Sequence, residues 1–454
     1  MYYFLFFACI ISRLISSIYY IEDIDSLRFA LSLSDEFNIT KFQPHFPGYP
    51  VFCFLGYIFY KLTGSIALSF SLIGGISTFL IIYFSLQIFK INIKSEESLF
   101  LIFIIFFNPM IWILSNRYMP DLLGLAIVIG AIYYIYYSDY KYSYYIGLAL
   151  AGLLIGVRLS YFPLLVIPVI LTIYKQKKIL SLVSFIFGVL IWMIPFIVNQ
   201  GLENLIIIGL KHTFGHFNDY GGTIITENNL FFRFKFLINT ILSDGLGIFW
   251  IHRHWLTVLI TILMLLLIRP FNIKIDRKLK IILISITIYT IWIFLFQNIV
   301  YKSRHVLPLV YFCIIYIYYL TLFNKRKSLE FLLIICTIFL TANLVTEHRN
   351  GTAIFQVSNY IKQKKPEIII SNSLVNYYLK SYNINTFFIN IENINEESIL
   401  DELKSVDSIT IIGDYTHLFQ QKYIAFNDTS FYHNPYINRM WSEIPIYTLN
   451  DKIE

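Results

Sequence analysis

Long apolar runs recur along the chain up to Val345, and short polar stretches that carry most of the charge separate them. Runs of this length can cross the roughly 30 Å hydrocarbon core of a bilayer as α-helices. Hydropathy and flanking charge together predict about eleven membrane-spanning helices. They cover Tyr2–Tyr19, Ile66–Phe89, Leu99–Leu114, Leu122–Tyr137, Tyr144–Val157, Phe162–Tyr174, Leu180–Val198, Trp255–Ile268, Ile281–Phe296, His305–Phe323 and Leu329–Val345. The less apolar stretch Val51–Leu62 predicts a helix that lies in the membrane interface or dips into the bilayer.

Basic clusters between these helices orient the chain. Lys90 with Lys94, Lys175–Lys178, the stretch Arg269–Lys280 and Lys325–Lys327 all fall on one side of the predicted zigzag. Because Lys and Arg are enriched in cytoplasmic loops, that side is predicted to be cytoplasmic. Large loops at residues 20–65 and 199–253 then face the outside of the plasma (inner) membrane. We therefore expect residues 1–345 to form the transmembrane module of an integral, multi-pass membrane protein.

The last part of the chain, residues 346–454, has a different pattern. Short β-branched runs alternate there with helix-forming segments, which predicts a small α/β domain with a mostly parallel sheet. The expected elements are helices at Phe355–Lys364, Leu374–Lys380 and Glu396–Lys404 and strands at Glu367–Ile370, Thr386–Ile389 and Ser408–Ile412. Since no glycine-rich phosphate fingerprint opens any of these helices, no nucleotide is assigned to the domain. An odd number of preceding spans puts it outside the cytoplasm.

Composition agrees with a membrane protein. The chain of 454 residues is 57% hydrophobic, 18% aromatic and 14% charged, which excludes an ordinary soluble globular protein. The net charge of +7 follows from the basic loops and does not indicate a nucleic-acid partner. The four cysteines are scattered without metal-binding spacing and indicate no disulfide framework. Because Met1–Ile18 lacks a basic n-region, we interpret it as an uncleaved first helix.

Candidate chemistry gathers in the predicted outer loops. The acidic cluster Glu22-Asp23-Ile24-Asp25 directly follows the first apolar segment, and Pro44-His45-Phe46-Pro47-Gly48-Tyr49-Pro50 comes about 20 residues later. A second loop carries Arg117-Tyr118-Met119-Pro120-Asp121, and a late turn carries Lys302-Ser303-Arg304-His305. Lys302 and Arg304 oppose the topological charge bias, which favours a role in binding an anion. Arg158 lies between two short apolar segments, where a charge is costly unless it faces water or a partner.

These motifs resemble the GT-C superfamily of integral-membrane glycosyltransferases. More narrowly, they are similar to the prokaryotic branch related to protein mannosyltransferases and aminoarabinose transferases. Asp25, Ser26, Phe29 and Ala30 match the acidic first-loop motif, and Pro47-Gly48-Tyr49-Pro50 matches the segment that follows it. Arg117–Asp121 looks like the second outer loop, and Arg304–Pro308 looks like the late turn. The chain departs from the pattern at Ser26, where a second carboxylate is common, and at His305, which replaces an aromatic residue.

The resemblance implies an inverting transfer of a sugar from a polyprenyl-phosphate carrier to an extracytoplasmic acceptor. Asp25 is the candidate general base, with Asp23 as the alternative, because a carboxylate must take the proton of the acceptor hydroxyl. The candidates for binding the carrier phosphate are the cations His45, Arg117, Lys302 and Arg304. The candidates for other substrate contacts are Tyr49, Asp121, Arg158 and His305. No metal ligands are assigned, and a divalent metal is not favoured because Asp25 lacks an adjacent carboxylate.

Structural roles compete with each assignment. For Asp23 and Asp25 the alternative is a solvated loop carboxylate, and for Asp121 it is a helix cap or a partner for Arg117. Arg158 could extend its charge to the membrane surface. His212 and His216 are spaced for one helix face, but Gly215 and the lack of a nearby base disfavour a zinc site.

Two rival functions stay open at this point. A surface-polysaccharide polymerase or ligase would use essential residues in the loop at 199–253. A non-enzymatic transporter of lipid-linked glycans would carry charged or helix-breaking residues at the bilayer midplane and internal repeats. The sequence does not identify the sugar, the carrier length or the acceptor, which could be a protein, a lipid or a glycan.

Overall fold

A computed structural model describes residues 1–268, 275–324, 326–393, 408–419 and 423–451. The chain folds into two compact units. A helical unit contains residues 1–19 and 28–349, and a C-terminal unit contains residues 350–454 together with residues 20–27. The acidic segment at 20–27 thus belongs to the C-terminal unit, although it lies near the start of the sequence.

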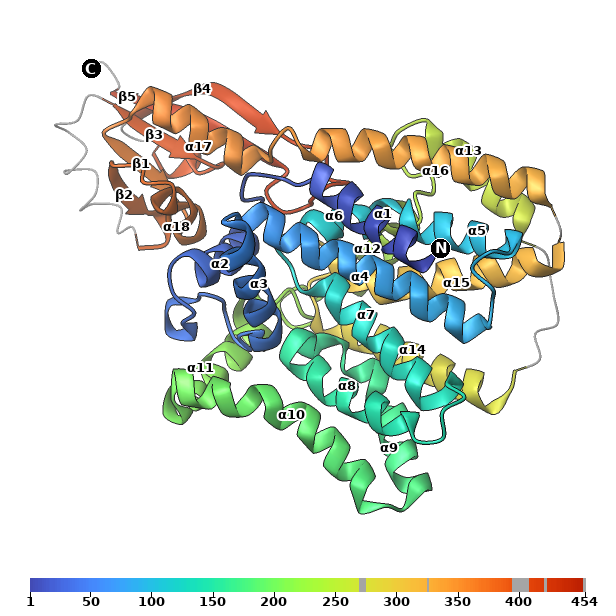
Figure 1. Cartoon of the computed structure of the whole chain (residues 1–454). Helices are drawn as coiled ribbons and strands as arrows, with labels where there is room; N and C mark the ends of the chain where they lie inside the picture. The colour runs from blue at the N-terminus through green and yellow to red at the C-terminus, as the bar shows by residue number, and fades with distance from the viewer. Residues whose placement is uncertain (269–274, 325, 394–407, 420–422, 452–454) are drawn as a thin grey trace. The chain divides into compact units, whose positions relative to one another are not determined.

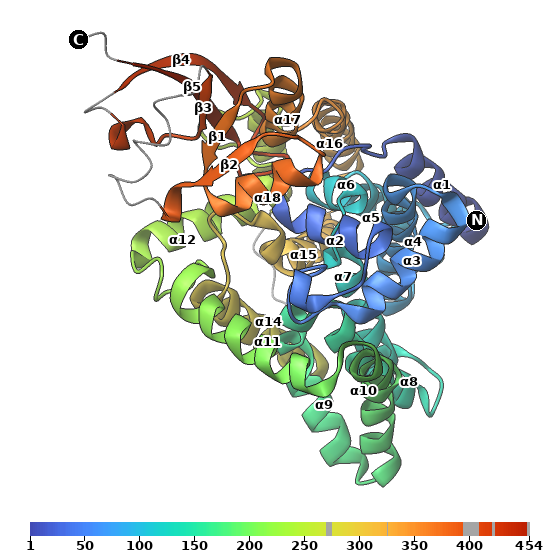
Figure 2. The same ribbon diagram turned by 90° about the vertical axis from the view of Figure 1, so that its left-hand side faces the viewer.

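The helical unit is built from α-helices joined by short turns, some of them 3₁₀ or π-helical (Figures 1 and 2). Its elements are α1 Tyr2–Ile15, α2 Ile24–Ser34 (whose first residues belong to the C-terminal unit), η1 Ile39–Lys41, α3 Pro50–Thr63, α4 Ile66–Phe89, α5 Glu96–Phe106, α6 Pro109–Asn116, α7 Asp121–Ile132, η2 Tyr133–Tyr137, α8 Ser143–Arg158, η3 Leu159–Tyr161, α9 Pro163–Gln176, α10 Ile179–Gln200, α11 Leu202–Gly215, η4 His216–Tyr220, α12 Leu230–Asn239, η5 Thr240–Gly245, α13 Leu256–Leu267, α14 Arg277–Phe296, η6 Ser303–Val306, α15 Leu307–Asn324 and α16 Lys327–His348.

Length and composition identify the membrane-spanning helices. Within the described residues, six helices are long and apolar enough to cross a bilayer, or seven if the pair α5 and α6, bent by 55°, forms one span. Five shorter apolar helices accompany them. Each predicted segment coincides with one of these helices, so the polytopic helical fold is confirmed. By length and composition, six or seven of the described helices are candidate spans, against about eleven predicted, and the predicted loop at 199–253 is largely helical.

Local sequence signals explain where several helices begin. The side chains of Ser65, Ser95 and Asn108 accept hydrogen bonds from backbone N–H groups in the first turns of α4, α5 and α6. Such caps satisfy N–H groups that have no partner within the helix. Proline occupies the first position of α3, α6 and α9, where its missing N–H costs nothing.

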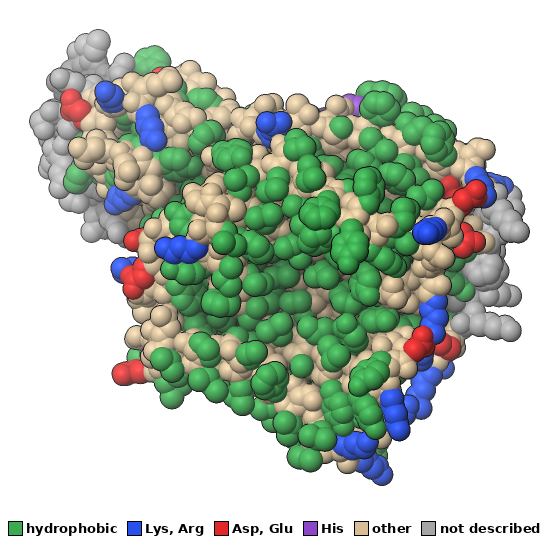
Figure 3. Space-filling view, viewed as in Figure 1, with side chains coloured by type: hydrophobic (Ala, Val, Ile, Leu, Met, Phe, Trp, Pro, Cys, Tyr) green, Lys and Arg blue, Asp and Glu red, His purple; other side chains and the backbone are tan. Residues whose placement is uncertain are grey.

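Burial separates central helices from peripheral ones. In α4, 61% of the most apolar window is buried inside the protein, against 17% in α10, and every residue of α7 is buried. A side chain at Gly74 on α4 would put its Cβ 1.8 Å from the carbonyl oxygen of Ser115, so glycine permits the close approach of α6. The exposed apolar side chains of α10 and their neighbours form a broad hydrophobic surface (Figure 3). Such a surface is suited to lipid and unsuited to water.

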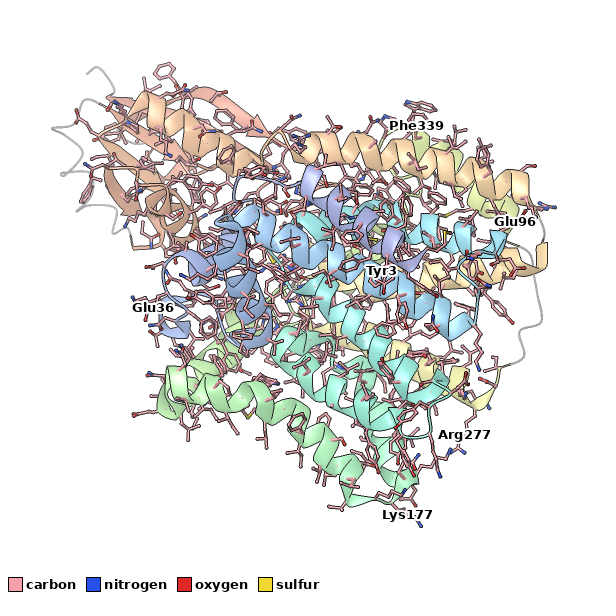
Figure 4. All side chains as sticks on the ribbon, in the orientation of Figure 1. Tyr3, Glu36, Glu96, Lys177, Arg277 and Phe339 are labelled. Atoms are coloured by element: carbon pink, nitrogen blue, oxygen red, sulfur yellow. The ribbon has the colours of Figure 1, made fainter. Side chains whose placement is uncertain are left out.

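Charged residues lie at opposite borders of the helical unit. Lys177, Arg277 and Glu96, which stand at turns predicted to be cytoplasmic, lie along one border, and Glu36 of the first loop lies at the opposite border (Figure 4). The helices between them therefore run from one polar border to the other, as helices that cross a bilayer must.

The C-terminal unit carries a five-stranded mixed sheet with strand order β2-β1-β3-β5-β4. Its elements are α17 Ala353–Lys364, β1 Ile368–Ser371, α18 Ser373–Ser381, β2 Phe387–Asn390, η7 Ile391–Asn393, β3 Ile409–Ile412, η9 Thr416–Leu418, β4 Tyr423–Tyr432 and β5 Glu443–Asp451. Strand β1 pairs in parallel with β2 and β3, whereas β5 pairs antiparallel with β3 and β4. The buried faces of these strands and residues of η9 form the core of the unit.

The predicted helices and strands of this unit are confirmed, apart from the helix at Glu396–Lys404, which lies outside the described residues. The prediction of a mostly parallel sheet was wrong in one respect, because β4 and β5 add an antiparallel hairpin. Strand β4 is largely exposed and includes Asn427-Asp428-Thr429-Ser430, so it lacks the apolar run that marked the other strands.

Candidate functional site

A buried ion-pair cluster in the helical unit brings together most of the predicted substrate residues. Asp121 opens α7, Arg158 ends α8, and Arg304 and His305 belong to η6. Asp121, Arg158 and Arg304 are between 0 and 4% exposed. Charged groups with so little access to water occur only where partners or a ligand offset the loss of hydration.

Asp121 is the centre of the cluster. Its Oδ1 lies 2.8 Å from Nη2 of Arg158 and accepts a hydrogen bond of 3.3 Å from the hydroxyl of Tyr161. Its Oδ2 lies 3.7 Å from Nε of Arg304. The same Tyr161 hydroxyl is 3.2 Å from the carbonyl oxygen of Arg304. One carboxylate therefore holds two arginines that come from distant parts of the sequence.

Aromatic and imidazole groups surround the Arg158 guanidinium. Nη1 donates to the hydroxyl of Tyr49 at 3.4 Å, and Nη2 lies 3.4 Å from Nδ1 of His305. The guanidinium carbon is 5.8 Å from the ring centre of Tyr49 and 5.7 Å from that of Tyr161, within cation–π range. The hydroxyl of Tyr49 lies 3.3 Å from Nε2 of His45. These contacts fix the plane of the guanidinium.

The fold lets α7 and α8 approach closely at this point. A side chain at Gly124 would put its Cβ 2.8 Å from Cβ of Arg158, so only glycine leaves room for the arginine. The hydroxyl of Tyr289 on α14 donates to the carbonyl oxygen of His305 at 2.7 Å and holds η6 in place. Tyr161 and Tyr289 were not predicted, because single tyrosines carry no signal in a chain with 35 of them.

Two arginines contact the Asp121 carboxylate, and the buried Nε of Arg158 has no hydrogen-bond acceptor among the described residues. Burial lowers the pKa of His216, and the nearby Lys302 lowers this pKa further. The hydrogen bond to the Phe296 carbonyl raises the pKa and offsets only part of the decrease. A phosphate is a ligand that paired guanidinium donors bind well.

Other predicted candidates have distinct places. Arg117 is buried at the end of α6 and starts the short loop to α7. His212 packs its ring against Phe42 at 4.9 Å, whereas His216 contacts the Phe296 carbonyl at 2.8 Å. Across the described part of the chain, no three His, Cys, Asp or Glu side chains group as metal ligands. The structural alternative for Asp121, a helix cap, does not apply, because its carboxylate pairs with Arg158.

The two candidate bases belong to the C-terminal unit. Asp23 precedes α2, and both of its carboxylate oxygens accept hydrogen bonds. Oδ1 accepts from the Ser26 N–H at 2.8 Å and Oδ2 accepts from Nδ2 of Asn438 at 2.9 Å. Asp25 lies in the first turn of α2 and is 2% exposed.

Comparisons with known proteins identify the fold. No protein-family model and no curated protein sequence matches the chain. The crystal structure of ArnT from Cupriavidus metallidurans, bound to undecaprenyl phosphate, matches with a TM-score of 0.51 and 10% sequence identity. The match covers 98% of this chain and 97% of ArnT. ArnT is a GT-C aminoarabinose transferase. Identity this low shows the fold alone, and it confirms that the chain has an ArnT-like fold.

Proposed function

We propose that the protein transfers a sugar from a polyprenyl-phosphate carrier to an acceptor outside the cytoplasm, with inversion at the anomeric carbon. The single observation that carries this proposal is the buried set of Arg158, Asp121 and Arg304 in a GT-C-like fold. A desolvated site that brings two guanidinium groups together suits a phosphate that must leave as an anion. Undecaprenyl phosphate is bound in the structure of ArnT, which supports a carrier of the same class.

Arg158 and Arg304 are assigned to the carrier phosphate, together with Lys302, His45 and Arg117. Arginine suits this task because its planar set of N–H donors matches two phosphate oxygens at once. Asp121 holds both guanidinium groups in position when no anion is bound. The polar atoms of Tyr49 and His305 lie beside Arg158, so a substrate held by this arginine would lie next to them.

Asp25 is assigned as the general base. Its carboxylate accepts the proton of the acceptor hydroxyl while the hydroxyl oxygen forms a bond to the anomeric carbon. The bond between that carbon and the phosphate oxygen breaks, and the phosphate leaves with the electron pair. Positive groups stabilise the charge that develops on the leaving phosphate and therefore act mainly in the transition state.

The test is a transfer assay in proteoliposomes with polyprenyl-phosphate sugars. A strain that lacks the protein is first compared with its parent by mass spectrometry of surface glycans and lipids, and the missing sugar names the donor and the acceptor. The Asp25→Asn variant should lose transfer and still bind the donor. Glu36→Gln is the matched control, since Glu36 is a carboxylate in the same predicted loop that pairs with Lys41 at the surface. Near-normal transfer by Asp25→Asn would refute the assignment.

A further inference from the structure

Residues 20–27 are held by side chains of the C-terminal unit through their backbone. The hydroxyl of Tyr378 on α18 donates to the carbonyl oxygen of Ile21 at 2.5 Å, and the Ile21 N–H donates to the hydroxyl of Tyr382 at 3.3 Å. Oγ1 of Thr352 donates to the carbonyl oxygen of Glu22 at 2.9 Å. The backbone groups of two consecutive residues, Ile21 and Glu22, are thus hydrogen-bonded to side chains of the C-terminal unit.

A chain of hydrogen bonds also leads from α17 to the side chain of Asp23. The Ala353 N–H donates to Nδ1 of His433, so Nδ1 is an acceptor and the imidazole carries its proton on Nε2. Nε2 of His433 donates to the carbonyl oxygen of Asn438 at 2.8 Å. The Asn438 amide is oriented by the Met440 N–H, which donates to Oδ1 at 3.0 Å. Nδ2 of Asn438 is therefore directed at Asp23.

Asp23 links this network to the start of α2. Its Oδ1 accepts the Ser26 N–H and its backbone carbonyl accepts the Leu27 N–H, so Asp23 is the cap of the helix that carries Asp25 in its first turn. A carboxylate with both oxygens accepting directed hydrogen bonds is poorly placed to accept a proton from a substrate. The geometry gives Asp23 a structural task at the start of the helix that carries Asp25.

We propose that the C-terminal unit is the positioning part of the transferase, with Asn438 and Tyr378 as positioning residues that act on Asp25 through Asp23 and Ile21. This inference rests on the proposed function, because it assumes that Asp25 takes part in transfer. It assigns the C-terminal unit a direct part in catalysis and removes Asp23 from the candidate bases.

The network allows a reciprocal exchange as its test. Asn438→Asp places a second carboxylate opposite that of Asp23, and the two repel each other. This variant should have a kcat at least tenfold lower, while the donor KM stays within twofold of the wild-type value. Adding Asp23→Asn restores one amide donor facing one carboxylate acceptor and still leaves an oxygen for the Ser26 N–H. The double variant should recover to within about threefold of wild-type kcat, since contacting residues couple energetically. A double variant no more active than Asn438→Asp would overturn the proposal.

Conservative variants separate positioning from general stability. Tyr378→Phe and Thr352→Val each remove one hydroxyl that binds the segment. Tyr360→Phe and Thr448→Val remove matched hydroxyls that bind Asp428 elsewhere in the same unit. Only the first pair should lower kcat, and only that pair should speed amide hydrogen exchange in residues 20–27. Burial raises the pKa of Tyr378, so its hydroxyl stays a donor throughout the pH range of the assay.

Hydrogen exchange also separates the two proposals. If the wild-type protein transfers no sugar, the proposed function fails, and the positioning of a base fails with it. If Asp25→Asn alone abolishes transfer while Tyr378→Phe speeds exchange in residues 20–27 without lowering kcat, the function stands and the positioning proposal is overturned. Loss of kcat in Tyr378→Phe without faster exchange would overturn it equally.

Discussion

Replacing Arg158 by methionine tests the proposed phosphate site most directly. Methionine replaces the aliphatic stem of arginine and carries no charge, so the change removes the 2.8 Å contact to Asp121 and the donors to Tyr49 and His305 together. Breaking a buried ion pair by removing one partner costs about 3–5 kcal/mol of folding stability. Because Tyr161 and Arg304 still contact Asp121, we expect a cost near the lower end, about 3 kcal/mol.

The effect on donor binding is a separate quantity. A hydrogen bond that involves a charged group is worth about 1.5–3 kcal/mol. Loss of one such bond to the carrier phosphate should therefore weaken binding by about 10- to 150-fold. The assay is the Kd of undecaprenyl phosphate for the detergent-solubilised protein, measured beside its thermal unfolding.

Arg13→Met provides the control. Arg13 is fully buried in the helical unit, where it donates to the Phe106 carbonyl at 2.8 Å and to Oγ of Ser115 at 3.2 Å. Its loss should destabilise the protein comparably and leave the Kd unchanged. An Arg158→Met variant that binds undecaprenyl phosphate as tightly as the wild type would refute the assignment of the cluster to phosphate.

Three further outcomes are expected. Gly124→Ala should destabilise the protein by about 1–3 kcal/mol and weaken binding of undecaprenyl phosphate, because the new Cβ would lie 2.8 Å from Cβ of Arg158. Thermal unfolding measures the first effect and the Kd measures the second, and an unchanged Kd would contradict the prediction. Asp121→Asn removes the internal counterion, so the variant should be less stable without ligand and gain a larger rise in Tm from undecaprenyl phosphate than the wild type; an equal or smaller rise would count against the idea. In the C-terminal unit, burial raises the pKa of Asp428, but hydrogen bonds from Lys364 and Thr448 outweigh it and lower the pKa below its ordinary value. A lowered carboxyl pKa stabilises the fold above about pH 4 and loses that effect as the pH falls further, so the Tm difference between wild type and Lys364→Met should shrink from pH 5 to pH 3.

The helical fold could be predicted because helices that cross lipid require long apolar runs in the sequence. A run such as Ile66–Phe89 has one physical explanation, and the capping serines and N-terminal prolines mark several helix starts. Strand β4 left no such trace, because the polar residues Asn427–Ser430 interrupt it and its partner β5 includes Pro445. The mixed sheet therefore emerged only from the strand pairing.

Individual residues of the site could be predicted from the sequence, but the contacts between them could not. Arg158 was a candidate because a charge in an apolar setting needs a partner, and Arg304 was a candidate because it opposes the topological charge bias. Their common partner, Asp121, is set by the packing of α7 against α8, and that packing depends on Gly124. Asn438 lies 415 residues from Asp23, and a contact over that separation depends on the tertiary fold. No local pattern distinguishes such an asparagine from the many others in the chain.

The account as a whole depends on the transfer reaction. The most direct measurement is the anomeric configuration of the product formed by the purified protein from a polyprenyl-phosphate sugar, determined by NMR and compared between wild type and Asp25→Asn. We expect the wild type to form product of inverted configuration and Asp25→Asn to form none while it still binds the donor. Product of retained configuration, or equal product from the two proteins, would contradict the mechanism.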